Sequence, residues 1–184
     1  MPEGMRRFFW FLNKYFMVPL FRLGFGALFV NPFGGYIMVM KVIGRKTGKL
    51  RYTPVNYAIY KGDVYCVSGG RKSSDWYKNL LATPELELIL PSGAVYTRVD
   101  EISDPETRRV VIRQILKNAG FAGFFEGYNP FSISDEELLQ RSGDMPLLRF
   151  HPQGLANGAA DPDGWLWMTV IVVTLLIILL LVRG

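Results

Sequence analysis

GRKTGKLRYTP, residues 44–54, places four basic side chains in a glycine-bounded turn between two apolar segments. Glycine lets the backbone reverse and leaves peptide N–H groups uncovered, and Arg and Lys surround those donors with positive charge. The stretch therefore predicts a site for an anionic group such as a phosphodiester or a row of carboxylates. It is not a nucleotide P-loop, because Gly44 and Gly48 are too close and Lys49 precedes Leu50, which has no hydroxyl for a metal ion. The alternative is a solvated hairpin tip, since charged turns are common.

A second set of motifs follows this turn along the chain. A strand-like segment, residues 64–68, leads into two glycines, a short polar loop and an aromatic pair. The shared features, in chain order, are the Gly-Arg-Lys-Thr-Gly-Lys turn, Arg51 with Thr53-Pro54, the Gly62-Asp63 hairpin, Ser68-Gly69-Gly70, and Trp76-Tyr77 with Asn79-Leu80. This ordered set resembles the deazaflavin-dependent nitroreductase family, relatives of the flavin-binding split barrels. The resemblance covers roughly residues 36–152.

The resemblance implies coenzyme F420 as the cofactor, a two-electron hydride carrier with an anionic phosphodiester and glutamate tail. It implies that Lys46 and Arg51 lie nearest the phosphate, with backbone donors from residues 45–47. It also implies that Trp76 covers or flanks the ring, and that Asn79 bonds the polar edge of the ring. The residues assigned to the cofactor are Arg45, Lys46, Thr47, Arg51, Thr53, Pro54, Asn56, Ser68, Gly69, Gly70, Trp76, Tyr77 and Asn79. The alternative role of the Trp76-Tyr77 pair is to anchor a helix on the barrel.

Two features depart from the family pattern. Asp75 stands where relatives more usually have a proline or an apolar residue, and an acid there could repel an anionic ligand. Residues 120–129 match only loosely the aromatic segment that covers the substrate pocket in relatives. Within that segment Tyr128 is the candidate catalytic residue, as a proton donor to a reduced carbonyl; the alternative is an ordinary packing aromatic.

Composition and charge limit the other classes of function. Residues 1–51 carry nine Lys and Arg against one acid, and the remaining residues carry twelve against fifteen, so the net charge of +5 comes from an N-terminal basic zone. No nucleic-acid-binding motif accompanies that charge. Cys66 and His151 are the single cysteine and histidine, so a metal cluster and a Ser-His-acid triad both lack parts. A bound cofactor is therefore expected to supply the chemistry.

Several predicted antiparallel hairpins with interposed helices favour a barrel-like α+β fold, and the resemblance implies that it is a mainly antiparallel split β-barrel of the FMN-binding type with peripheral helices. Hairpin signals separate several of the predicted strands, and Ser134 with Glu137 forms a capping-box signature. The predicted strands are residues 36–43, 52–60, 64–68, 86–90, 95–102 and 146–150, and the predicted helices are residues 73–82, 105–118 and one that follows Ser134.

The two ends of the chain predict appended segments. Residues 165–182 are an uninterrupted apolar run without charge, which predicts a C-terminal transmembrane helix after a linker, residues 153–164. Residues 1–35 combine basic side chains with aromatics at helical spacing, which predicts a helix lying in the membrane interface or packed on the barrel. The resulting plan is an N-terminal segment, a cofactor-binding barrel over residues 36–152, the linker and the anchor.

Together these features predict a membrane-anchored oxidoreductase that transfers a hydride from reduced deazaflavin to a lipophilic acceptor, a quinone or a nitro or enone compound. The lipid bilayer is its expected partner, nucleic acid is not, and a homodimer is possible because split barrels often dimerise. The expected location is the cell membrane, with a single-pass anchor and a cytoplasmic catalytic domain. Two alternatives remain: a barrel that binds FMN or haem, and a non-catalytic tethered module that sequesters a cofactor or lipid.

Overall fold

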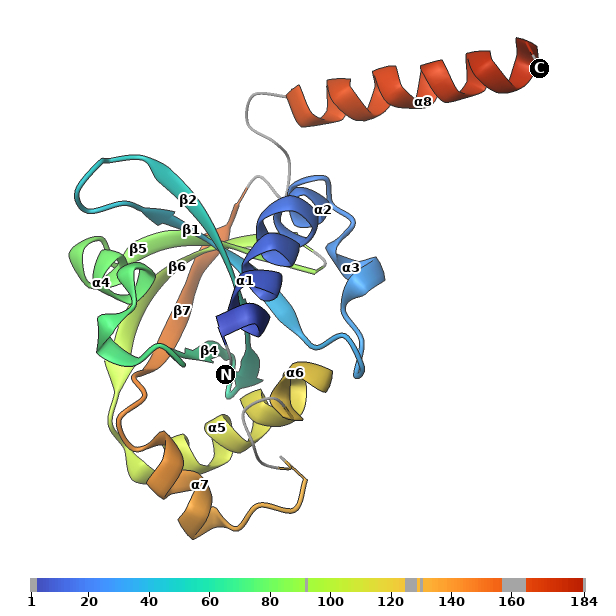
Figure 1. Cartoon of the computed structure of the whole chain (residues 1–184). Helices are drawn as coiled ribbons and strands as arrows, with labels where there is room; N and C mark the ends of the chain where they lie inside the picture. Colours follow the sequence, from blue (N-terminus) through green and yellow to red (C-terminus); the bar gives the residue numbers. More distant parts are fainter. Residues whose placement is uncertain (1–2, 92, 125–128, 130, 157–164, 184) are drawn as a thin grey trace.

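The computed structural model describes residues 3–91, 93–124, 129, 131–156 and 165–183 (Figure 1). Within these residues, seven strands form one antiparallel sheet with the order β2-β1-β5-β6-β7-β4-β3. The strands are β1 (Ile37–Ile43), β2 (Leu50–Asn56), β3 (Ala58–Tyr60), β4 (Asp63–Val67), β5 (Glu85–Leu90), β6 (Gly93–Ile102) and β7 (Leu147–Leu155). The predicted α+β class and antiparallel sheet are confirmed.

The sheet curls because one short stretch of chain supplies both of its edges. The predicted strand 52–60 is two strands, β2 and β3, separated only by Tyr57 and lying at opposite edges of the sheet. An open flat sheet could not bring its first and last strands to adjacent residues, so the sheet closes toward a half-barrel, consistent with the split-barrel expectation. The break is held by Asn56, whose Nδ2 donates to the carbonyls of Tyr36 (3.3 Å) and Asn118 (3.4 Å).

Strand β1 is apolar at every position except Lys41, because both of its faces are covered. Met38 and Met40 face the barrel core, where they pack with Leu88 and Phe150, and all four side chains are fully buried. On the other face, Val39 packs in a separate cluster beneath the N-terminal helices. The strand next to the basic turn is therefore fixed from both sides.

Three helices pack on the sheet or connect its strands. They are α4 (Asp75–Ala82), α5 (Pro105–Asn118) and α7 (Asp135–Ser142), with the short α6 (Phe121–Phe124) after α5. Asp104 caps α5 by accepting a 2.8 Å hydrogen bond from Thr107 N, and Ser134 caps α7 by accepting one from Glu137 N at 3.2 Å. The predicted cap at Ser134 is confirmed.

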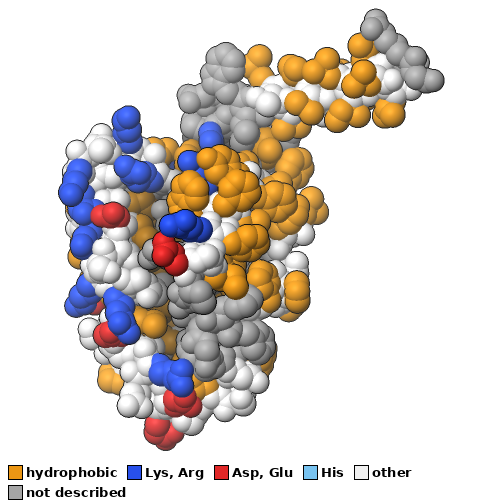
Figure 2. Space-filling view, viewed as in Figure 1, with side chains coloured by type: hydrophobic (Ala, Val, Ile, Leu, Met, Phe, Trp, Pro, Cys, Tyr) orange, Lys and Arg blue, Asp and Glu red, His pale blue; other side chains and the backbone are white. Residues whose placement is uncertain are grey.

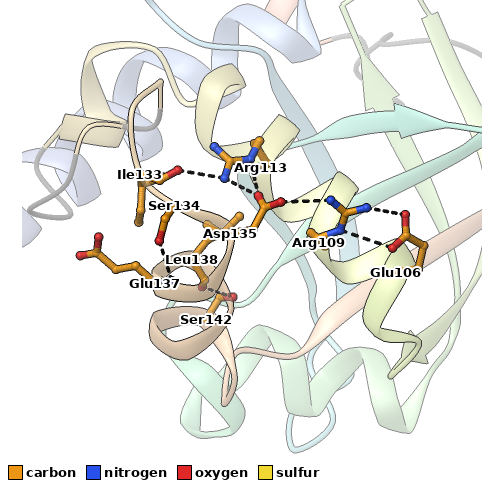
Figure 3. Close-up of polar contacts among 9 residues, drawn as sticks. All are labelled: Glu106, Arg109, Arg113, Ile133, Ser134, Asp135, Glu137, Leu138 and Ser142. Atoms are coloured by element: carbon orange, nitrogen blue, oxygen red, sulfur yellow. Dashed lines mark hydrogen bonds and ion pairs between the residues drawn. The ribbon is translucent and has the colours of Figure 1, made fainter.

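An ion-pair network joins α5 to α7 (Figure 3). Asp135 Oδ2 accepts a 3.0 Å hydrogen bond from Arg109, which also pairs with Glu106 at 2.7 Å. Arg113 bonds the other oxygen of Asp135 and donates to the carbonyl of Ile133 at 2.9 Å. These hydrogen bonds, from Arg113 first and Arg109 second, lower the pKa of Asp135. The network fixes the loop that leads into α7.

The N-terminal residues form a helical arm that packs across one face of the sheet. Its elements are α1 (Glu3–Leu12), the π-helical turn η1 (Asn13–Met17), α2 (Val18–Arg22) and α3 (Gly26–Phe29). Met17 and Phe21 are buried against Val39 and Ile89, so α2 packs on the sheet. Hydrophobic side chains gather over these helices in Figure 2. The exposed ones are Phe8, Trp10, Phe11, Tyr15, Phe16, Leu28 and Phe33.

The C-terminal helix corrects one prediction. Helix α8 spans Trp165–Arg183. Among the residues that the structure describes, none belongs to a helix with the length and apolarity needed to cross a bilayer. The predicted transmembrane anchor over residues 165–182 is wrong, and so is the cell-membrane location that rested on it.

Candidate functional site: a groove along strand β2

The basic turn is a closed hairpin connection between β1 and β2. Gly44 N donates to Lys49 O at 2.9 Å, and Thr47 N and Gly48 N donate to Gly44 O at 3.0 and 2.7 Å. Gly44 leaves room for neighbouring side chains, because a Cβ there would lie 2.9 Å from Thr47 Oγ1 and 3.0 Å from Arg51 Nε. The glycine thus lets the Arg51 side chain pack against the turn.

Arg45 connects this turn to helix α4. Its Nη1 donates to Asn79 Oδ1 at 2.8 Å and its Nη2 to Asp75 Oδ1 at 2.9 Å, while Arg45 N also donates to Asn79 Oδ1 at 3.2 Å. The hydrogen bond and then the charge of Arg45 lower the pKa of Asp75. Asp75 therefore neutralises one arginine of the turn, and two of the three backbone N–H groups expected to face an anion, those of Arg45 and Thr47, are bonded within the protein.

The remaining cations of the turn are available to a ligand. Within the described part of the chain, Lys46, Lys49 and Arg51 have no carboxylate at ion-pair distance. Lys46 and Arg51 line a cavity of about 850 Å³ between the turn and α4, and Lys49 does not. Lys and Arg side chains are numerous on this edge of the molecule (Figure 2). This cavity brings together seven predicted site residues: Arg45, Lys46, Thr47, Arg51, Thr53, Trp76 and Asn79.

The cavity continues along β2 and becomes apolar. A second cavity of about 880 Å³ shares Arg51, Thr53 and Trp76 with the first and adds Pro54. A third, of about 290 Å³, keeps Trp76 and adds the predicted residues Asn56 and Gly69. A fourth, also of about 290 Å³, shares Asn56 and lies among apolar side chains of the N-terminal arm, β1 and α6. The four cavities form one groove, cationic at one end and apolar at the other.

Three predicted site residues point elsewhere. Ser68 is fully buried and its Oγ donates to Arg71 O at 2.9 Å. Tyr77 is buried and its hydroxyl donates to Glu101 Oε2 at 2.6 Å, a hydrogen bond that, followed by burial, raises the pKa of Tyr77 to about 12. Gly70 lines none of the four cavities, and a Cβ there would lie 2.2 Å from Ser74 Oγ, so this glycine permits a tight loop. Tyr128 lies outside the described residues.

Sequence reasoning missed the contribution of helix α1 and the turn after it. Phe9 and Asn13 each line three of the four cavities, and Trp10 lines the two nearest the basic turn. The sequence signal that could have found this contribution is the polar pair Asn13 and Lys14 within an otherwise aromatic run. Such a pair indicates a helix face different from that of the exposed aromatics. Cys66 and His151 lie outside the groove: burial raises the pKa of the Cys66 thiol, and His151 Nδ1 is 3.0 Å from Asp63 Oδ1.

A half-barrel with a basic groove along one strand has the architecture of the cofactor-binding split barrels. The model of the F420H(2)-dependent quinone reductase family matches residues 24–127, more than half of the chain, and the protein belongs to that family. It is therefore an F420-dependent oxidoreductase, with coenzyme F420 as its cofactor. Both predictions are confirmed. A search of curated proteins finds no match.

One of three similar solved structures supports the fold. A conserved hypothetical protein from Mycobacterium tuberculosis superposes with a TM-score of 0.50 at 17% identity, covering 69% of this chain and 78% of that chain. An F420-H2-dependent reductase covers 62% of this chain and 93% of its own at 20% identity, with a TM-score of 0.41. The haem storage protein HutZ from Vibrio cholerae covers 67% and 86% at 13% identity, with a TM-score of 0.45.

Proposed function

We propose that the protein transfers a hydride from reduced F420, held in the β2 groove, to a flat apolar acceptor such as a quinone, a nitro compound or an enone. The observation that supports this is the polarity of the groove. Unpaired cations stand at one end, and an apolar cavity lies at the other. An anionic tail joined to a flat ring matches the first part, and an acceptor without charge matches the second.

The residues present fit this cofactor by their chemistry. Lys46 and Arg51 supply the positive charge for the phosphodiester and the tail carboxylates, and Arg45 and Asn79 hold the turn against α4. Trp76 lines three successive cavities and offers a flat apolar wall, while Gly69 lines the third without an obstructing side chain. When bound, F420 supplies two-electron hydride chemistry; the chain supplies binding, orientation and exclusion of water.

The proton that a reduced carbonyl needs is assigned to Tyr128, an assignment that stays a prediction, as does the homodimer. A direct test of the function measures oxidation of reduced F420 by its absorbance, with 2-methyl-1,4-naphthoquinone, a nitroaromatic compound and no acceptor. The proposal expects turnover above the protein-free rate with at least one acceptor, and no acceleration by the protein when reduced FMN replaces reduced F420. Oxidation at the acceptor-free rate in every case would refute it.

A further inference from the structure

The first part of the N-terminal arm, residues 3–22, lies outside the family match. The match begins at residue 24, whereas α1 and η1 end at Met17. These elements nevertheless contribute Phe9 and Asn13 to three cavities and Trp10 to two. The arm therefore adds chemistry of this chain's own to the groove.

Asn13 stands where the cavities meet. The two apolar cavities, each about 290 Å³, share Phe9, Asn13, Val55 and Asn56, and Asn13 also lines the cavity that follows from the basic turn. Asn13 opens the π-helical turn, whose wider bond runs from Val18 N to Asn13 O. Such turns interrupt the regular rotation of a helix and often occur at functional sites.

The amide of Asn13 has no partner within the part of the chain that the structure describes. The fourth cavity has two other polar side chains among its described lining residues, and both already form hydrogen bonds within the protein. Asn31 donates to Phe29 O at 3.3 Å and accepts from Phe33 N at 3.0 Å and Gly34 N at 2.8 Å. Asn56 uses its Nδ2 on two backbone carbonyls. Asn13 is half-buried and its amide is not sealed from solvent, so a ligand in the cavity can replace water as its hydrogen-bond partner.

We infer that Asn13 determines which acceptor binds, by donating a hydrogen bond from Nδ2 to an oxygen of a flat apolar molecule in the fourth cavity. The carbonyl of a quinone or enone and the oxygen of a nitro group share this acceptor chemistry. A hydrocarbon of the same shape would fill the cavity and leave the amide without its bond. This selectivity rests on the proposed function only in naming the bound molecule as the hydride acceptor.

The test compares two ligands of the same ring size that differ in their oxygens. Binding of 2-methyl-1,4-naphthoquinone and of 2-methylnaphthalene to the full chain is measured by equilibrium dialysis, without cofactor. The variants are Asn13→Leu, which removes the amide, and Asn13→Asp, which keeps the size but removes the donor. Tyr15→Phe is the matched control, because Tyr15 is exposed, neighbours the same turn and lines none of the four cavities.

We expect both Asn13 variants to bind the quinone about tenfold more weakly, as for one lost hydrogen bond, with unchanged affinity for the hydrocarbon. The control should match the original protein for both ligands. Equal losses for both ligands would indicate packing alone, and no loss for the quinone would remove Asn13 from the site; either result overturns the inference. Failure of the proposed function is separate, since it would abolish oxidation of reduced F420 while leaving these affinities as expected.

Discussion

Removing one cation that lines the groove should weaken F420 binding far more than removing one that does not. The pair to compare is Arg51→Ala with Lys49→Ala, because both substitutions remove one positive charge from the same turn. Arg51 lines the first two cavities and packs against Gly44, whereas Lys49 lines none of the four. Lys46→Ala belongs with Arg51→Ala, since Lys46 lines the first cavity.

The expected size follows from the kind of bond that is lost. A hydrogen bond between a charged donor and an anion contributes about 1.5–3 kcal/mol, so Arg51→Ala and Lys46→Ala should each weaken binding roughly ten- to a hundredfold. Lys49→Ala removes only a screened charge at a distance, and about threefold or less is expected. Salt should weaken binding to the original protein, because the cationic end of the groove is open to solvent.

Fluorescence titration of F420 against the three variants and the original chain, at low and physiological ionic strength, gives these values. If Arg51→Ala and Lys46→Ala bind as tightly as Lys49→Ala does, the turn is a solvated hairpin tip and the cofactor tail lies elsewhere. Equal large losses in all three variants would show a general effect of charge and would equally refute the assignment of a specific cavity.

Three further predictions concern the turn, the core and a helix cap. Asp75→Asn should tighten F420 binding about two- to threefold by releasing Arg45 from its carboxylate partner. Arg45 lowers the pKa of Asp75, so the ion pair is intact above the ordinary carboxylate pKa and is lost as the pH falls through the lowered value. In the original chain, acid should therefore weaken the contact between Arg45 and Asp75. An NMR titration of Asp75 can follow this change. Phe150→Ala, in the centre of the barrel, should lower the free energy of unfolding in urea by about 3–5 kcal/mol, whereas Ile59→Ala on the exposed face should change it by less than about 0.5 kcal/mol. Ser134→Ala should cost about 1 kcal/mol in the same assay, and no change would deny its capping role.

The sequence predicted correctly the elements that are determined by residues close to one another in the chain. Helix α5 occupies residues 105–118 as expected, because Asp104, Pro105 and the apolar spacing all act within a few residues of one another. The basic turn also lies between two strands as expected. Its glycines and charges are adjacent in the chain, so no distant contact was needed to place it.

The remaining features depend on contacts between distant residues. The split of residues 52–60 into β2 and β3 follows from pairing with β1 on one side and β4 on the other. Arg45 is held by Asp75 and Asn79 across the space between the turn and α4, so the acid expected to repel an anion instead binds a neighbouring arginine. The role of Tyr77 likewise depends on its long-range hydrogen bond to Glu101, which no periodicity in the sequence encodes.

The central claim is that F420 lies in the β2 groove with its tail at the basic turn, and a crystal structure of the complex tests it most directly. The account predicts the phosphodiester within hydrogen-bond distance of Lys46 or Arg51 and the deazaflavin ring against Trp76. A separate cavity with basic side chains, lined by Arg71, Lys72 and Arg108, lies elsewhere on the molecule and is the alternative site for the cofactor tail. Density for the cofactor tail in that cavity, with the β2 groove holding no part of the ring, would contradict the account.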